Sequence, residues 1–289
     1  MSARLIPLED TWVDVIRKAR MGLGLTEKEL GRRSGLTDAQ IKTLESGMLD
    51  PEKLVALAAA LELHPGRLLA IACGEYHPGA ILLPEGMAMF SAPWHDFEVH
   101  SYLVWDVPST NGVETSGGFR EKRAAAVFDC GPDATEMMDF VAHHNLSLGQ
   151  VFLTHGHGDH VFDLERVTEK TGSAAWIGIN ETLEGVNRFE PGREFFIGSL
   201  RVETRSTRGH SPGGVTFLIH GLEKPVAIVG DALFAGSMGS PFESYQFCLA
   251  DNWREIFSLP LETILCPGHG PLTTVALEQN NNPFFGNAS

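Results

Sequence analysis

The chain has 289 residues, of which 43% are hydrophobic and 20% charged, and its formal net charge is −15 at pH 7. This length suggests more than one globular domain, and no apolar run approaches the roughly 20 residues of a membrane helix. The first residues lack a signal-peptide core, and the 4 cysteines form no pair at metal or redox spacing, so we expect a cytoplasmic protein with reduced thiols and no membrane partner.

The first quarter of the chain is predicted to be helical throughout. Thr26 is followed three residues later by Glu29, the capping-box pattern of a helix start, and Thr37 with Gln40 repeats the pattern. Apolar residues at helical spacing follow each start. Together these signals predict five short helices within residues 12–72.

The segment 25–47 and its continuation to residue 69 resemble the helix-turn-helix of the Cro-like phage-repressor family. This resemblance implies a small all-α domain over residues 1–75, whose third helix could enter the DNA major groove with Thr37, Gln40 and Lys42 exposed. Residues 1–75, however, hold ten Lys and Arg against eleven Asp and Glu, so a basic surplus for phosphate contacts is lacking. We therefore expect the domain mainly to pack or to form a homodimer, with DNA as the second choice of partner.

Residues 73–96, rich in Gly and Pro, are expected to be a linker leading into a second domain over residues 76–289. Apolar runs in that domain predict strands at 97–107, 124–129, 151–153, 174–177, 215–219, 226–229 and 263–265. Helical patterns predict helices at 133–145, 163–171, 252–258 and 274–280.

The run from Thr154 to His160 is the most informative feature of the sequence. It places His155, His157, Asp159 and His160 directly after the short buried strand at 151–153. Imidazole and carboxylate groups are the ligands that zinc and non-haem iron take in catalytic sites. The intervening glycines allow tight turns, so alternate side chains can point at one centre. This run therefore predicts a metal site.

Three further ligand candidates also follow strand-like runs. They are His210 in Gly-His-Ser-Pro-Gly, Asp231 after the run 226–229, and His269 in Pro-Gly-His-Gly-Pro. Loops at strand ends are where α/β folds gather binding groups, so these residues are expected to join the first cluster.

These motifs, with the tail Thr273-Thr274 … Glu278 … Asn282-Pro283-Phe284, resemble the metallo-β-lactamase superfamily and its glyoxalase II-like branch over roughly residues 80–286. The resemblance implies an αββα sandwich, so the whole chain is expected to be α+β. It also implies two divalent metal ions, most simply zinc, with iron as an alternative. His155, His157 and His210 would hold the first metal and Asp159, His160 and His269 the second, with Asp231 bridging.

The same resemblance implies a hydrolase that cleaves a thioester or related acyl substrate with a metal-bound hydroxide, in which Asp159 and Asp231 are the catalytic carboxylates. Two alternatives stay open: a mononuclear iron persulfide dioxygenase, and a ligand-sensing DNA-binding regulator that uses this fold as its effector domain. Metal identity and natural substrate do not follow from the sequence.

Two details concern the substrate. Glyoxalase II-like relatives often carry Arg-Thr-Asp after Gly-Ser-x-Gly, whereas Ser240 stands here, so an arginine contact to glutathione is not expected at this position. The loop before the strand at 97–107 often overhangs the active site in this superfamily, and we expect its apolar residues to form a substrate-facing flap: Met87, Met89, Phe90 and Trp94. The alternative is that these four side chains pack against the helical domain.

Overall fold

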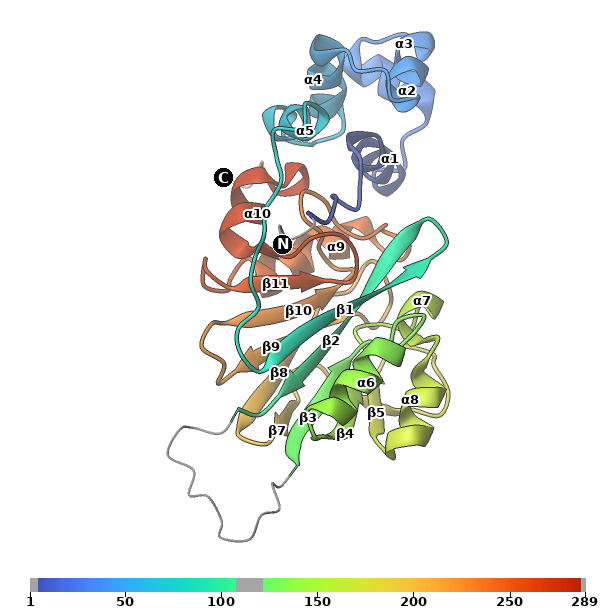
Figure 1. The fold of residues 1–289 in the computed structure, drawn as a ribbon. Helices are drawn as coiled ribbons and strands as arrows, with labels where there is room; N and C mark the ends of the chain where they lie inside the picture. The colour runs from blue at the N-terminus through green and yellow to red at the C-terminus, as the bar shows by residue number, and fades with distance from the viewer. Residues whose placement is uncertain (1–4, 108–121, 287–289) are drawn as a thin grey trace, which may run out of the picture.

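In the computed structural model, which describes residues 5–107 and 122–286, five helices precede two β-sheets with their covering helices (Figure 1). The five helices are α1 (Trp12–Gly22), α2 (Glu27–Ser34), α3 (Asp38–Glu45), α4 (Pro51–Ala60) and α5 (Pro65–Ala72). The predicted all-α segment is thereby confirmed.

The predicted capping boxes are formed at the starts of α2 and α3. The hydroxyl of Thr26 accepts a hydrogen bond from the Glu29 backbone N–H at 3.2 Å, and the Glu29 carboxylate accepts one from the Thr26 backbone N–H at 3.0 Å. Thr37 and Gln40 repeat this exchange. Each box satisfies backbone donors that the first helical turn leaves unpaired, which is why these short helices begin where they do.

The remaining elements form two six-stranded sheets. The first sheet has the order β1 (Met87–Trp94), β2 (Phe97–Trp105), β3 (Arg123–Phe128), β4 (Leu146–Phe152), β5 (Ala174–Gly178), β6 (Asn187–Phe189). The second has the order β12 (Thr273–Thr274), β11 (Ile264–Pro267), β10 (Val226–Gly230), β9 (Val215–His220), β8 (Leu200–Ser206), β7 (Glu194–Ile197). The helices of this part are α6 (Thr135–His143), α7 (Gly158–Val161), α8 (Leu164–Thr171), α9 (Tyr245–Asp251) and α10 (Val275–Asn281).

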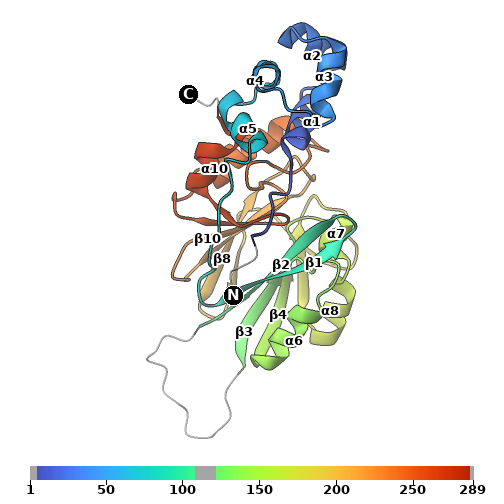
Figure 2. The ribbon, with the colours of Figure 1, turned by 45° about the horizontal axis from the view of Figure 1, so that its top comes forward.

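Apolar side chains alternate between the two faces of the first sheet and so separate its layers. Phe128 packs with Phe152 and Phe217 between the sheets, whereas its neighbour Val127 packs under α6 and α8. The outer face of the second sheet is covered by α9 and α10 in the same way. The expected αββα sandwich is therefore confirmed, and Figure 2 shows its layers from a second direction.

The structure corrects two details of the predicted elements. The stretch expected to be a linker up to residue 96 already contains β1, because Met87 to Trp94 pair with β2 along its whole length. The helix expected at 252–258 begins earlier, at Tyr245, where the Ser244 hydroxyl accepts a hydrogen bond from the Phe247 N–H, and it continues as a π-helical turn.

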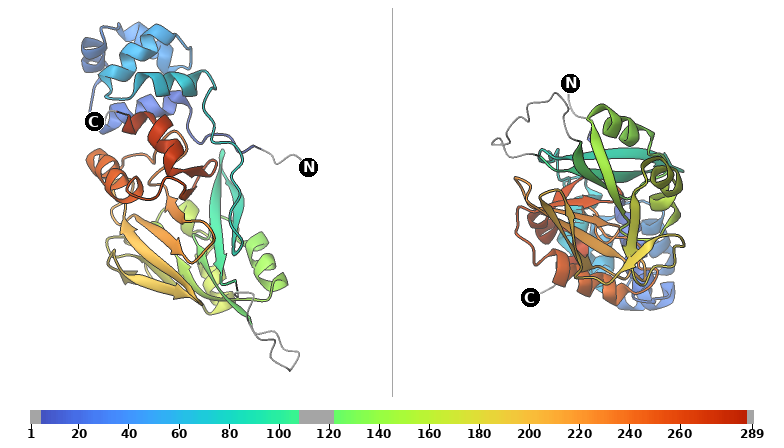
Figure 3. Two further views of the ribbon diagram at one scale, coloured as in Figure 1. Left: turned by 90° about the vertical axis from the view of Figure 1, so that its left-hand side faces the viewer. Right: turned by 90° about the horizontal axis from the view of Figure 1, so that it is seen from below.

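The N-terminal helices sit against the helices that cover the outer face of the second sheet (Figure 3). One apolar cluster contains side chains of α1, α4 and α5 together with Leu233, Met238 and Phe284. The Tyr76 hydroxyl donates to the buried Glu278 carboxylate at 2.6 Å across this boundary. Among the described residues no helix is both long and apolar enough to cross a membrane.

Candidate metal centre

The loops that carry the predicted ligands leave neighbouring strands at one edge of the two sheets. The first loop follows β4 and continues into α7, and the others follow β8, β10 and β11. Parallel pairing of β10 with β11 brings the ends of those strands together, so Asp231 and His269 lie side by side. The topology thus gathers residues that are more than a hundred positions apart in the sequence.

Three groups of side chains place their ligand atoms within 4.8 Å of one another. They are His155, His157 and His210; His155, His160 and Asp231; and Asp159, His160 and His269. All seven residues proposed from the sequence are therefore brought to one place, and their grouping matches a binuclear metal centre.

Asp231 lies between the two halves of this cluster. One carboxylate oxygen is 3.3 Å from His160 Nε2, and the other is 3.3 Å from His210 Nε2 and 3.4 Å from His269 Nε2. A carboxylate in this position can offer one oxygen to each of two cations. Its geometry agrees with the bridging role that the sequence comparison implied.

The ring orientation of three histidines is fixed by their Nδ1 partners. His210 Nδ1 donates to the Ser240 carbonyl at 2.9 Å and His269 Nδ1 donates to the Glu98 carbonyl at 2.8 Å. His160 Nδ1 lies 2.9 Å from the Asp129 carboxylate. Because these partners are acceptors, Nδ1 holds a proton in each of the three rings, and Nε2 is the nitrogen that faces the centre.

Two atoms of the cluster are buried without a hydrogen-bond partner among the described residues. They are His160 Nε2 and Asp231 Oδ1. Buried polar atoms are normally satisfied, since leaving one unpaired costs free energy. A cation between them would satisfy both, and imidazole with carboxylate is a donor set that suits zinc or iron. The residues present therefore fit the metals that the sequence implied.

The pKa values divide the histidines into two kinds. Burial lowers the pKa of His210 to about 4 and that of His155 well below its ordinary value. Burial also opposes protonation of His160 and His269, but Asp231 and the other nearby carboxylates outweigh it and raise the pKa to about 10 and about 11. A metal ion at the second group must therefore displace protons.

Two supporting carboxylates were not identified from the sequence. Asp129 accepts hydrogen bonds from the Thr154 N–H at 2.8 Å and hydroxyl at 2.7 Å, as well as contacting His160. Glu181 accepts from the Gly156 N–H at 3.2 Å and the Gly213 N–H at 2.9 Å, so it joins two ligand loops. For Asp129 a signal was present, because it ends a buried strand on a carboxylate as Asp231 does.

Two glycines allow the ligand loops to approach each other. A Cβ at Gly268 would lie 2.3 Å from Asp231 Oδ1 and 2.5 Å from His160 Cε1. At Gly239 it would lie 2.0 Å from the Asp231 carbonyl oxygen. Any larger residue at these positions would push the ligands apart, so the glycines are part of the centre.

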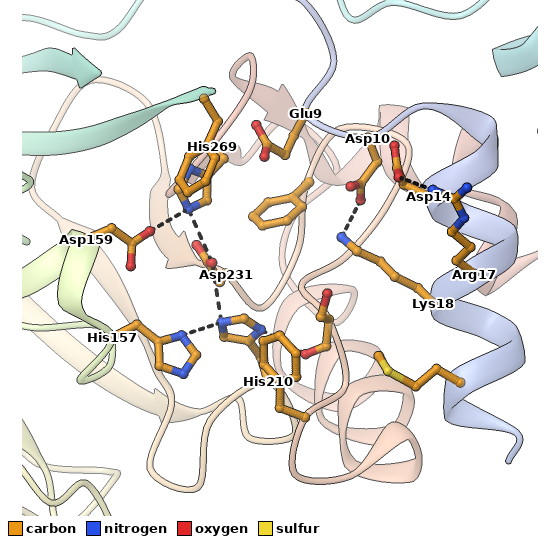
Figure 4. Close-up of a pocket in the computed structure, with 15 residues that line it drawn as sticks. Glu9, Asp10, Asp14, Arg17, Lys18, His157, Asp159, His210, Asp231 and His269 are labelled. Atoms are coloured by element: carbon orange, nitrogen blue, oxygen red, sulfur yellow. Dashed lines mark hydrogen bonds and ion pairs between the residues drawn. The ribbon is translucent and has the colours of Figure 1, made fainter. Parts of the chain in front are cut away.

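A pocket of about 510 Å³ opens in front of the ligand atoms (Figure 4). One side, here called the metal wall, consists of His157, Asp159, His210, Asp231 and His269 with Phe97, Phe234, Ser240 and Phe242. The other side, here called the N-terminal wall, consists of Glu9, Asp10, Asp14, Arg17, Lys18 and Met21. The sequence did not indicate that the helical domain reaches this pocket.

The expectation that four apolar residues form a flap over this pocket is wrong. Met87, Met89, Phe90 and Trp94 lie in β1 and do not line this pocket. Met87 is buried between the sheets, Phe90 packs edge-on against Phe140, and Trp94 packs against Phe162. Pairing of β1 with β2 holds these side chains in the sheet, and Phe97 at the start of β2 is the residue of this strand pair that lines the pocket.

The residues proposed for DNA contact do not line this pocket: Thr37 caps the start of α3, and Gln40 and Lys42 lie within that helix. Thr37 and Lys42 are exposed, while Ile41 and Leu44 are buried as expected. The Gln40 side chain is already engaged, since its oxygen accepts from the Thr37 N–H at 2.9 Å. Lys42 has Glu27 within 3.8 Å.

Comparison with protein families and curated proteins gives consistent matches. The family model of the metallo-β-lactamase superfamily matches residues 115–269, and a helix-turn-helix model matches residues 16–68. A probable metallo-hydrolase of Streptococcus pyogenes is 30% identical over 56% of this chain and 82% of that protein. A hydroxyacylglutathione hydrolase of Haemophilus influenzae is 27% identical over 67% of this chain and 95% of that protein.

Solved structures show the same fold. ETHE1 from Myxococcus xanthus superposes with a TM-score of 0.56 at 23% identity, covering 70% of this chain and 86% of that one. The protein TTHA1623, solved in a di-iron-bound form, superposes with a TM-score of 0.51 at 25% identity, covering 68% of this chain and 99% of that one.

Proposed function

This chain belongs to the metallo-β-lactamase superfamily, and we propose that it is a metal-dependent hydrolase that cleaves a thioester or a related acyl substrate. The observation that carries the proposal is the position of Asp231, whose two oxygens face both groups of ligand nitrogens at 3.3 to 3.4 Å. A centre arranged in this way suits two cations rather than one.

His155, His157 and His210 would hold one cation, and Asp159, His160 and His269 the other, with Asp231 shared. Two divalent cations held here would supply a hydroxide nucleophile near neutral pH and polarise the substrate carbonyl. We propose zinc as the metal, because neutral imidazole and carboxylate ligands suit it, and iron is accepted by the same ligands.

The residues of the chain have defined tasks in this reaction. Asp231 and Asp159 would keep the two cations at a fixed spacing, and the Nδ1 partners of the histidines would keep the rings aimed. Phe97 and Phe234 pack edge-on against His269, with ring centroids at 5.0 and 5.7 Å. These rings would shield the reacting carbonyl from bulk water, which strengthens electrostatic interactions inside the pocket.

A thioester is proposed as the substrate for two reasons. A thiolate leaves with little need for protonation, so its departure requires no separate general acid. The curated relative from Haemophilus influenzae is a hydrolase of a glutathione thioester by its name. Ser240 lacks a guanidinium group, so glutathione itself is not proposed as the leaving thiol.

Metal analysis of the purified full-length protein, combined with turnover of a panel of thioesters and lactones, tests this proposal. We expect close to two zinc ions per chain and hydrolysis of at least one thioester. One iron per chain with oxygen consumption on a persulfide would instead establish the dioxygenase alternative and overturn the hydrolase.

For the helical domain we propose packing as its main role, with a homodimer as a further arrangement. DNA is a second candidate partner because α3 lies in the part of the helical domain remote from the sheets (Figure 1), and Thr37 and Lys42 are exposed. A sequence-specific, salt-sensitive shift of DNA by the full-length protein, lost in Gln40→Ala, would establish DNA binding and the regulator alternative.

A further inference from the structure

The pocket in front of the metal centre is completed by a different domain from the one that carries the ligands. Glu9 and Asp10 come from the segment before α1, and the rest of the N-terminal wall comes from α1 itself (Figure 4). A substrate whose carbonyl sits at the ligands must fill the space between the two walls. The N-terminal wall is therefore placed to select among substrates.

This wall is fixed to the metal wall rather than loosely apposed. The Lys18 ammonium donates to the Met238 carbonyl at 2.8 Å and pairs with Asp10. The Ser237 hydroxyl donates to the same Asp10 carboxylate. Ser237 and Met238 belong to the loop between β10 and α9, which also contains Ser240, whose carbonyl orients His210. Partly buried polar contacts thus hold the two walls together.

The charges of the N-terminal wall are paired with one exception. Asp10 pairs with Lys18, and Asp14 accepts from the Thr11 N–H at 3.0 Å and lies 3.8 Å from Arg17. Arg17 also donates to the Glu45 carbonyl at 2.7 Å. No hydrogen bond or ion pair joins the Glu9 side chain to another described residue. The Glu9 carboxylate is therefore the acidic group of this wall that has no direct partner among the described residues, and His269 and Lys18 attract it only at longer range.

The Glu9 carboxylate points into the pocket beside His269 (Figure 4). It is partly buried, and burial raises the pKa of its carboxyl. Among the described residues, the three groups with converging ligand atoms do not include Glu9. We therefore do not treat Glu9 as a metal ligand. The backbone of Gly270 packs against that of Glu9, since a Cβ at Gly270 would lie 2.9 Å from Glu9 N. This contact ties Glu9 to the loop that carries His269.

We propose that Glu9 is a specificity-determining residue that binds an ammonium group of the substrate close to the scissile carbonyl. This inference rests on the proposed function, because it assumes that a carbonyl substrate occupies the metal centre. A partly desolvated carboxylate without a partner favours a cation that it can also hydrogen-bond, and it disfavours a carboxylate or phosphate. The two cations of the wall are already paired and offer no competing site for an anion.

Direct binding to the zinc-loaded full-length protein tests the proposal without requiring turnover. The probes are a series of short ω-amino carboxylates, the alkyl carboxylates of equal length and the corresponding dicarboxylates, each titrated by calorimetry. Their common carboxylate would engage the metals, while their other end differs. We expect at least one amino carboxylate to bind about tenfold more tightly than its alkyl counterpart.

The variant Glu9→Gln keeps the size of the side chain and removes its charge, so the preference for the amino probe should disappear while zinc content stays unchanged. Glu52→Gln, at an exposed position of α4, is the matched control and should keep the preference. Equal affinities of amino and alkyl probes for the natural protein, or tighter binding of dicarboxylates, would overturn the proposal. If the natural protein itself bound no zinc and hydrolysed no thioester, that result would count against the proposed function instead.

Discussion

The metal wall and the N-terminal wall of the pocket differ in how their side chains are held. In the metal wall the ligands sit in loops at strand ends or, for Asp159, in the short helix α7, and backbone carbonyls of Ser240 and Glu98 fix the orientation of His210 and His269. In the N-terminal wall the side chains stand on a helix and on the segment before it, and their contacts reach across more than two hundred residues, as from Lys18 to Met238.

In this molecule the residues proposed for catalysis and those proposed for substrate selection therefore belong to different domains. Sequence motifs encode the ligands and their spacing, whereas the opposite wall depends on how two domains dock. A change on one wall should therefore leave the other largely intact, and four experiments can break or sharpen that separation.

The largest effect is expected for Asp231→Ala. Because this carboxylate faces ligand nitrogens of both groups, the variant should lose most of both metals and its turnover should fall by orders of magnitude. Elemental analysis and steady-state kinetics measure the two losses. Asp139→Ala, at an exposed position of α6, is the control. Retention of two metals by Asp231→Ala would refute the bridging role.

A strong dependence of metal affinity on pH is expected next. In the metal-free protein the pKa of His160 is about 10 and that of His269 about 11, raised against the effect of burial by Asp231 and neighbouring carboxylates. Both rings are therefore protonated at pH 7, and loading the second site should release on the order of two protons. Calorimetry in buffers with different ionisation enthalpies counts the protons. An affinity that does not change between pH 6 and pH 9 would contradict this expectation.

The sign of the accompanying stability change follows from the same shifts. Because the folded-state pKa lies above the ordinary value of 6.5, protonation of these rings stabilises the metal-free fold fully below about pH 6.5. That contribution is lost as the pH rises through about 10 to 11.

A smaller effect is expected for Asp129→Asn, which keeps the shape of the side chain but weakens its contact with His160 Nδ1. Changes in such supporting groups typically cost about 10- to 100-fold in metal affinity. The loss should fall on the second metal, while the first, held by His155, His157 and His210, is retained. Stepwise zinc titration with a chromophoric chelator separates the two. Equal weakening of both sites would show that Asp129 acts on the whole edge of the sheet.

The smallest effect is expected on the N-terminal wall, for Gly22→Ala. A Cβ at this last residue of α1 would lie 2.3 Å from the ring of Tyr245, so α1 or the tyrosine must shift, at a cost of about 2 kcal/mol of folding free energy. Gly149→Ala, where a Cβ meets nothing within 4 Å, is the control. Denaturant unfolding gives the free energy, and zinc content should stay unchanged. Loss of zinc in Gly22→Ala would show that the walls are not separable.

The metal wall was predictable from the sequence to a large extent because its signals are local. Four ligands stand within six positions after one buried strand, and each of the others is flanked by Gly or Pro at a strand end. The four-residue capping boxes that begin at Thr26 and Thr37 likewise predicted the starts of two helices. Asp129 carried the same strand-end signal and could have been included.

The N-terminal wall could not be predicted because nothing local marks it. Glu9 lies in the pocket beside the backbone of Gly270, a contact between opposite ends of the chain. The apolar residues of β1 were misplaced for a similar reason. Their pattern suits a flap or a strand, and only the register with β2, which pairs Met87 with Val104, decides between them.

The apolar cluster that runs from α1 and α5 to the outer face of the second sheet has a thermodynamic consequence. Two sequence domains that share one buried cluster melt together, so they have a common unfolding transition. A cation that binds only the native centre shifts that transition by mass action for both of them. Removal of the metal by a chelator should thus lower the melting temperature of the helix-turn-helix domain as well. The stability of the helical domain would then depend on the concentration of free metal.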